Sequence, residues 1–123
     1  MLTKSVNEKS SLIYTATLKD EDGVVIPLAD ITALTLSLYS LDDPARAAIN
    51  SRSSQSILNV NGGTMHATSG LLTIILGPLD NVIVDSTLGQ ERHLAEVRWT
   101  FNGGNSVGST TFMIVVSNLV KVT

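Results

Sequence analysis

The chain has 123 residues, a length that suits one domain with a hydrophobic core large enough to fold without covalent staples. It contains no cysteine, which excludes disulfides, thiolate metal sites and cysteine nucleophiles. Its net charge is -3, and its eight Lys and Arg residues form no run or stripe, so we expect no nucleic-acid partner.

Charged residues make up only 15% of the chain, against roughly 25% in an average domain. Such a surface suits a subunit of an assembly as well as a soluble monomer. Residues 1–5 have no apolar segment behind them, so they do not form a signal peptide. No run approaches the ~18 apolar residues of a membrane helix. We therefore expect synthesis in the cytoplasm of the producing cell and no membrane partner.

Residues 1–10 are polar and without periodicity, and they are predicted to be an N-terminal arm or an edge segment. Residues 11–123 are predicted to form a single β-sandwich domain. The first clear strand spans Ser11–Lys19, because apolar residues alternate with polar ones there. The turn Asp20–Gly23 follows, since a hairpin turn favours Asp and Gly. The inward residues of this strand are Leu12, Tyr14, Ala16 and Leu18.

The second full strand is predicted over Ile31–Ser40, with leucines at 34, 36 and 38 facing inward. The short apolar piece before it ends at Pro27, which favours an edge or a connection. Residues 41–63 are the least regular part of the chain. We expect at most one or two short helical turns between residues 43 and 60, one opened by Asp43 and Pro44 and one capped by Ser53 or Ser54.

A short strand is predicted over Thr64–Ala67, and a stronger one over Leu71–Leu76. The second of these is apolar on both parities, which is typical of a central strand of a sandwich. Gly77 and Pro78 end it, and Ser86–Gln90 is predicted to be a loop.

The hairpin over Leu94–Phe101 and Thr110–Ser117 is predicted to be the centre of the core, with a turn at Asn102–Asn105. The final strand is apolar on both parities, so we expect the second sheet to cover one face and a partner the other. Leu119–Val122 is a possible extension. The inward residues of the first strand are Ala95, Val97, Trp99 and Phe101, and those of the second are Phe112, Ile114 and Val116, with Met113 and Val115 on the opposite face.

The spacing of these strands, with turn residues between them, predicts an all-β fold, an antiparallel sandwich or barrel of about seven strands. All five aromatic residues fall inside predicted strands, so we interpret them as core residues. Trp99 in particular is expected to anchor the core and not to bind a ligand. The paired glycines at 62–63 and 103–104 precede no helix, so they are predicted turns and not phosphate loops.

The ionisable residues show no spacing typical of a catalytic or metal site. His66 and His93 have no second histidine nearby, so we expect surface or strand histidines. In the acidic turn Asp20–Gly23 the glycine comes at position 4, whereas a calcium-binding loop of the EF-hand type has it at position 6. This favours a hairpin turn.

Three carboxylates, Asp80, Asp85 and Glu91, would act as a pair only if the fold brought them together. Glu96 and Arg98 share the outward face of their strand and would pair with cross-strand neighbours or with another subunit. No Gly-x-Ser-x-Gly motif of a serine hydrolase is present. We therefore expect no catalytic residue, no cofactor, no metal ligand and no enzymatic activity.

Several segments resemble small structural proteins of tailed bacteriophages. The run D-E-D-G-V-V-I-P-L-A-D-I-T-A-L-T-L-S-L-Y, from Asp20 to Tyr39, is similar to the opening of the N-terminal domain of phage upper baseplate proteins. The later segments I-N-S-R-S-S-Q-S-I-L-N-V-N-G-G, S-G-L-L-T-I-I-L-G-P-L-D-N and E-R-H-L-A-E-V-R-W-T-F-N-G-G resemble phage virion proteins of about this length. The resemblance spans most of the chain, from Ser11 to about Val116.

This resemblance implies an Ig-like β-sandwich with a structural role in the virion, and it implies no catalytic site. Baseplate proteins of that group have long C-terminal extensions, whereas this sequence stops at Thr123. We therefore expect a stand-alone capsid decoration (cement) protein or a head, neck or tail accessory subunit. The expected partners are the major capsid protein, other virion proteins or further copies of the chain. The alternative is a tail or baseplate adhesion module that binds a host-surface glycan or protein.

Overall fold

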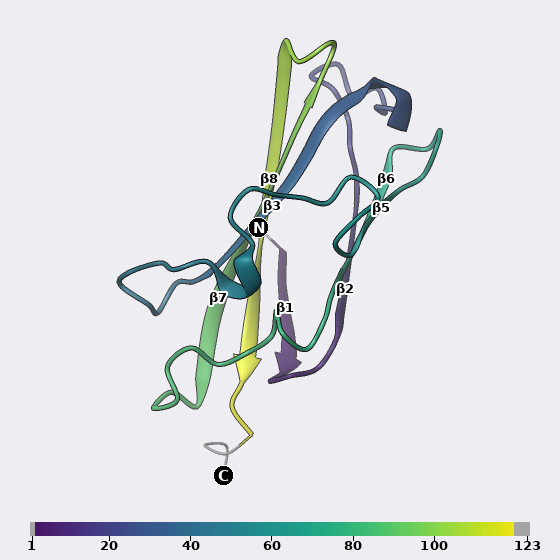
Figure 1. The fold of residues 1–123 in the computed structure, drawn as a ribbon. Helices are drawn as coiled ribbons and strands as arrows, with labels where there is room; N and C mark the ends of the chain where they lie inside the picture. Colours follow the sequence, from purple (N-terminus) through teal and green to yellow (C-terminus); the bar gives the residue numbers. More distant parts are fainter. Residues whose placement is uncertain (1, 120–123) are drawn as a thin grey trace.

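The computed structural model describes residues 2–119, in which eight strands form two sheets (Figure 1). The strands are β1 (Leu2–Asn7), β2 (Leu12–Thr17), β3 (Ile31–Ser40), β4 (Gln55–Ser56), β5 (Gly63–Met65), β6 (Leu71–Leu76), β7 (Gln90–Phe101) and β8 (Ser106–Ser117). Two short 3-10 turns, η1 (Leu28–Asp30) and η2 (Ile49–Ser51), flank β3. None of the helices in the described residues is long and apolar enough to span a membrane.

The two sheets divide the strands as an immunoglobulin-like sandwich does. One sheet has the order β1-β8-β7-β3-β4 and the other the order β2-β6-β5. In immunoglobulin domains the second, fourth and fifth strands of the basic seven (B, D and E) likewise face the third, sixth and seventh (C, F and G). The extra short strand β4 lies beside β3, at the far edge of the larger sheet. The predicted all-β sandwich is confirmed.

Two details differ from the predicted antiparallel sandwich of about seven strands. Eight strands form, and residues 2–7, predicted to be an arm or an edge segment, form the edge strand β1 of the larger sheet. One pair is parallel: β1 runs alongside β8, with Leu2 opposite Phe112 and Asn7 opposite Ser117. No hairpin joins β1 to β8, because the chain leaves β1 for β2 in the other sheet. The pairing of β1 with β8 therefore need not be antiparallel.

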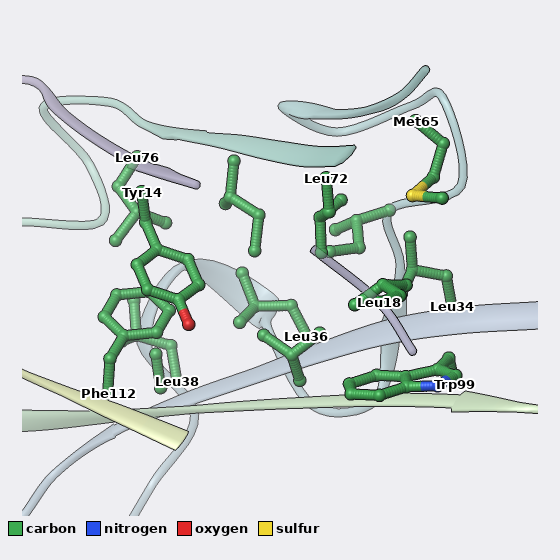
Figure 2. Close-up of a cluster of buried hydrophobic side chains, with 14 of the residues drawn as sticks. Tyr14, Leu18, Leu34, Leu36, Leu38, Met65, Leu72, Leu76, Trp99 and Phe112 are labelled. Carbon is green, nitrogen blue, oxygen red and sulfur yellow. The ribbon is translucent and has the colours of Figure 1, made fainter. Parts of the chain in front are cut away.

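The core lies between the sheets and follows the predicted alternation. The inward residues of β7, from Ala95 to Phe101, are all buried, as are the three leucines of β3. Figure 2 shows Tyr14 of β2 lying over Phe112 of β8, and the two ring centroids are 3.9 Å apart in a stacked arrangement. The aromatic contact joins the two layers near one end of the sandwich.

Trp99 lies at the other end of the core, among Leu18, Leu34 and Met65 (Figure 2). Its cross-strand partner on β8 is Gly108. A Cβ atom at position 108 would overlap the indole ring, so the ring occupies the space that a side chain would fill. Trp99 is therefore a core anchor, as predicted, and a glycine is required opposite it.

β6 is the central strand of the smaller sheet, as predicted, yet only one of its faces is buried. Leu72, Ile74 and Leu76 are fully buried, whereas Leu71 and Ile75 are 40% and 48% exposed. Nothing in the described residues covers the outer face of the smaller sheet, so the apolar residues on both parities of this strand do not mark burial on both faces.

The final hairpin is longer than predicted. β7 begins at Gln90 and not at Leu94, and β8 begins at Ser106 and not at Thr110. Met113 and Val115 are half-buried on the outer face of the larger sheet, so the partner expected there stays a prediction. Leu119 lies in a turn, and the rest of the predicted extension to Val122 falls outside the described residues.

Within residues 41–63 one helical turn forms, the 3-10 turn η2 at Ile49–Ser51. Asp43 accepts backbone hydrogen bonds from Ala45 and Ala47, which closes a turn but starts no helix. The predicted second turn after Ser53 is wrong, because β4 occupies that place by pairing with β3. The turn η1, directly after Pro27, was not predicted.

Candidate functional site

The three carboxylates considered from the sequence each have their own partners. Asp80 binds Arg52, Glu91 binds His93, and Asp85 accepts hydrogen bonds from the backbone and hydroxyl of Thr87. Asp80 and Glu91 are buried, so neither is open to a substrate. Residues 2–119 contain no cluster of three or more His, Asp or Glu side chains placed to hold a metal ion.

The first buried polar centre joins the irregular segment 41–63 to the corner after β6. The guanidinium of Arg52 donates two hydrogen bonds to Asp80, with Nε–Oδ1 and Nη2–Oδ2 distances of 2.5 and 3.1 Å. Its Nη1 reaches the Gln55 side chain and the Asn61 carbonyl. The centre therefore ties η2, β4 and the turn before β5 to the end of β6.

Asp80 completes this centre from the other side. Its carboxylate also accepts hydrogen bonds from the Asn50 amide at 3.0 Å and from the Gly77 backbone N–H at 2.9 Å. Burial raises the pKa of Asp80, but the hydrogen bonds from Arg52, Asn50 and Gly77 outweigh it, so the pKa lies below 3.8. An ionised carboxylate with every oxygen engaged in this way holds a loop and does not act as an acid or base.

The second buried polar centre lies where β7 begins. His93 Nε2 and Glu91 Oε2 are 2.5 Å apart, and both side chains are fully buried. The Glu91 carboxylate also accepts the backbone N–H groups of Val84 and Asp85. His93 Nδ1 has no hydrogen-bond partner within the described residues. This centre pins the loop before β7 onto that strand.

Glu91 and His93 fall between the predicted loop, which ends at Gln90, and the predicted strand, which starts at Leu94, and the sequence pattern did not predict this centre. The inward parity of β7 runs back from Ala95 through His93 to Glu91, and this alternation was the signal that could have found it. The predicted start at Leu94 stopped short because a charged residue and a histidine at inward positions are unusual. His93 is therefore a strand histidine, as predicted, but a buried and paired one.

The remaining ionisable residues considered from the sequence serve turns or face solvent. Asp20 Oδ1 accepts the backbone N–H groups of Asp22 and Val24, which confirms the predicted hairpin turn. His66 Nδ1 accepts the Ser69 N–H in the turn before β6. Neither Glu96 nor Arg98 forms an ion pair within the described chain, since their cross-strand neighbours are Ser and Thr. Their pairing with another subunit stays a prediction.

An exposed ion pair ties the start of segment 41–63 to β7. The Arg92 side chain donates to Asp42 at 2.8 Å, and the Arg92 backbone N–H donates to the same carboxylate. These hydrogen bonds lower the pKa of Asp42 and raise the pKa of Arg92. Because the pair is exposed, it contributes little to stability.

The outer face of the smaller sheet is an uncharged surface, and we call it the neutral face. Its strand residues carry no charge, and apolar and threonine side chains lie in rows across it. Ile13 is opposite Ile75, and Thr15, Thr73 and Thr64 form the next row. The neutral face comprises Ile13, Thr15, Thr17, Thr64, Leu71, Thr73 and Ile75.

The described surface also carries shallow depressions. One of about 600 Å³ lies beside the β1–β2 turn and the loop before β7, where Glu8, Lys9, Val82 and Thr87 contribute to its walls. Another, of about 370 Å³, lies between Ile75, Leu79 and the Arg52–Asp80 centre. Neither of these two depressions is lined by a nucleophile hydrogen-bonded to a base.

Comparison with known proteins adds little to this picture. No family model and no curated protein matches the sequence. Among solved structures, a chimeric titin Z1Z2 carrying an exogenous peptide from decorin aligns with 96% of this chain at 11% identity and a TM-score of 0.41. The chain spans 45% of the length of that protein. The fold assignment above rests on strand order and pairing.

Proposed function

We propose that the chain is a non-enzymatic structural subunit of a tailed-bacteriophage virion, either a capsid decoration protein or a head, neck or tail accessory protein. The observation that carries this proposal is how the buried charged groups are used. Arg52, Asp80, Glu91 and His93 all hold loops in place. What remains for function is an uncharged sheet face and open strand edges, which are surfaces for other proteins.

The sequence resemblance to phage virion proteins supplies the kind of assembly. The first of the segments that carry it, Asp20–Tyr39, corresponds to the turn after β2, η1 and β3. On this proposal the partners are the major capsid protein or other virion proteins, together with further copies of the chain. Nucleic acid and membrane are not partners, and the protein is assembled into the virion in the host cytoplasm.

The mechanism would be stabilisation by mass action. A subunit that binds only the assembled lattice lowers the free energy of that lattice relative to its separated parts. Particles that carry the subunit should then withstand heat better than particles that lack it.

The test is to purify particles of the encoding virus and determine their structure by cryo-electron microscopy. We expect density for the two-sheet sandwich at full occupancy on the head, neck or tail. Particles made without the gene should lose their contents at a lower temperature, and purified wild-type protein should restore the resistance. A chain that is absent from mature virions would overturn the proposal. Binding to host glycans on an array, without lattice occupancy, would support the adhesion module instead.

A further inference from the structure

The outer edge of β2 is open along its whole length. β2 is the outermost strand of the smaller sheet and pairs only with β6. The Leu18 N–H bonds the Gly70 carbonyl in continuation of that ladder, so even-numbered residues face β6. Because the direction of backbone groups alternates along a strand, the N–H and C=O groups of Ile13, Thr15 and Thr17 point to the free edge.

The other sheet edges are protected, and β2 is not. β4 and β5 are only two and three residues long. β1 carries Lys4 on its inward side, opposite Ile114, and an inward charge discourages pairing with another chain. β2 has six residues, Leu-Ile-Tyr-Thr-Ala-Thr, without a charge, proline, glycine or bulge. It is the longest unprotected edge among the described residues.

The core of the sandwich is also only partly covered along the side formed by β1 and β2. Val6 of β1 and Leu12 and Ala16 of β2 are only partly buried, although they pack against the core. On the outer surface, Ile13 is 56% exposed beside Ile75. A strand added next to β2 would bury apolar side chains on both faces of the sheet at once.

We propose that β2 pairs with β2 of a second copy of this chain, antiparallel about a two-fold axis. The proposal rests on the assembly role given above and names the surface that serves it. Faces match only if residues of the same parity lie opposite one another. With the axis at Thr15, the centre of the uncharged run 12–18, Thr15 lies opposite Thr15 of the second copy and Ile13 lies opposite its Thr17. The product is a six-stranded sheet with one continuous neutral face.

Charge selects the second copy as the occupant. In this register residues 12–18 lie opposite one another and none is charged, while Lys19 lies opposite Ser11. A strand that pairs with itself must avoid like charges, and β2 does so although the whole chain carries -3. The same arrangement centred on β1 would place Lys4 against Lys4.

The test uses the purified full chain and two matched variants. Thr15→Lys places like charges opposite each other at the proposed axis, whereas Thr64→Lys adds the same charge to β5, on the same face at the other edge. Analytical ultracentrifugation should show a wild-type dimer. We expect Thr15→Lys to raise the dissociation constant at least about tenfold and Thr64→Lys to leave it unchanged. Mixing Thr15→Lys with Thr15→Glu should restore a dimer.

Hydrogen exchange locates the contact. The amides of Ile13, Thr15 and Thr17 should become protected as the wild-type concentration rises, and should stay unprotected in Thr15→Lys. A wild-type chain that stays monomeric at the highest attainable concentration would overturn the inference, as would a dimer in which these amides exchange freely. A monomeric chain that still occupies virions would refute only this pairing. A dimer that is missing from virions would refute only the proposed function.

Discussion

At the scale of single residues, two ring contacts shape the core: one ring lies against a glycine and the other against a second ring. The indole of Trp99 lies across Gly108, and the ring of Tyr14 lies flat on Phe112. The first contact lies within the β7–β8 hairpin, and the second joins positions that are far apart in the sequence. The alternation of β7 predicts that Trp99 faces inward, but nothing in the sequence predicts which residue must be small to receive it.

Gly108→Ala should therefore destabilise the fold. The new methyl group would overlap the indole, and accommodating it should lower the free energy of unfolding by about 1–3 kcal/mol. Urea unfolding followed by the fluorescence of the single tryptophan would measure the loss. Gly77→Ala is the matched control, because a methyl group there meets no atom within 4 Å. Equal stability of the two variants would contradict the packing described.

Trp99→Ala should cost more, because it empties a space in the core. We expect a loss of roughly 3–5 kcal/mol, enough to unfold a domain of ordinary stability. Circular dichroism during thermal unfolding would show it. Val107→Ala, at an exposed position on β8, should change stability by no more than about 0.5 kcal/mol. A Trp99→Ala chain that stays fully folded but loses a partner would show that the indole serves binding and not packing.

At the scale of elements, the sequence pattern predicts the strands but not the side-chain contacts that hold the loops between them. Period-2 alternation predicts β2, β3 and β7 with their inward faces. It does not predict that Arg52 meets Asp80, since the two come from different loops and meet only when both sheets have formed. The alternation also failed at the start of β7, where Glu91 and His93 take inward positions that apolar residues normally fill.

Apolar residues on both parities were also an unreliable sign of burial. In β6 apolar residues occupy both parities, yet Leu71 and Ile75 face outward and are 40% and 48% exposed. Cover depends on what lies above the sheet, which a local pattern does not contain. A local pattern likewise could not reveal the parallel pairing of β1, because its partner β8 is far away in the sequence.

The Arg52–Asp80 tie should show in the pH dependence of stability. The pKa of Asp80 is lowered below 3.8 in the folded chain, so its contribution is complete above the unfolded value and is lost as the pH falls through the folded pKa. The free energy of unfolding of the wild-type chain should thus decrease as the pH drops below about 4. Asp80→Asn should cost about 3–5 kcal/mol at pH 7 and should flatten this acid limb. Denaturant titrations from pH 7 to pH 2.5 would measure both effects.

Asp42→Asn provides the comparison for that experiment. It removes a carboxylate of lowered pKa that also binds an arginine, but the pair is exposed. Its loss at pH 7 should be much smaller than that of Asp80→Asn. If the two variants lost equal stability, the buried centre would not be the tie that holds segment 41–63.

At the scale of the whole molecule, the two flanks of the sandwich differ. One flank ends in the short strands β4 and β5, and the other in the six-residue strands β1 and β2. Short edges resist pairing with other chains, whereas long ones invite it. The molecule therefore has one flank suited to solvent and one suited to assembly.

Deleting residues 1–7 should expose the edge of β8, which β1 covers in the intact chain. Without β1, the edge of β8 from Phe112 to Ser117 loses its ladder, and Val6 no longer packs on the core. We expect stability to fall by roughly 2–4 kcal/mol and the chain to associate at lower concentration. Light scattering against concentration would show the association. Lys4→Ala in the full-length chain keeps the ladder and should keep most of the stability.

The parallel β1–β8 ladder also constrains the order of events during synthesis. Among the described strands the first pairs with the last, so β1 has no partner in its own sheet until β8 has been made. The larger sheet joins segments far apart in the sequence, which slows its formation. The larger sheet therefore cannot be completed before β8 has been synthesised.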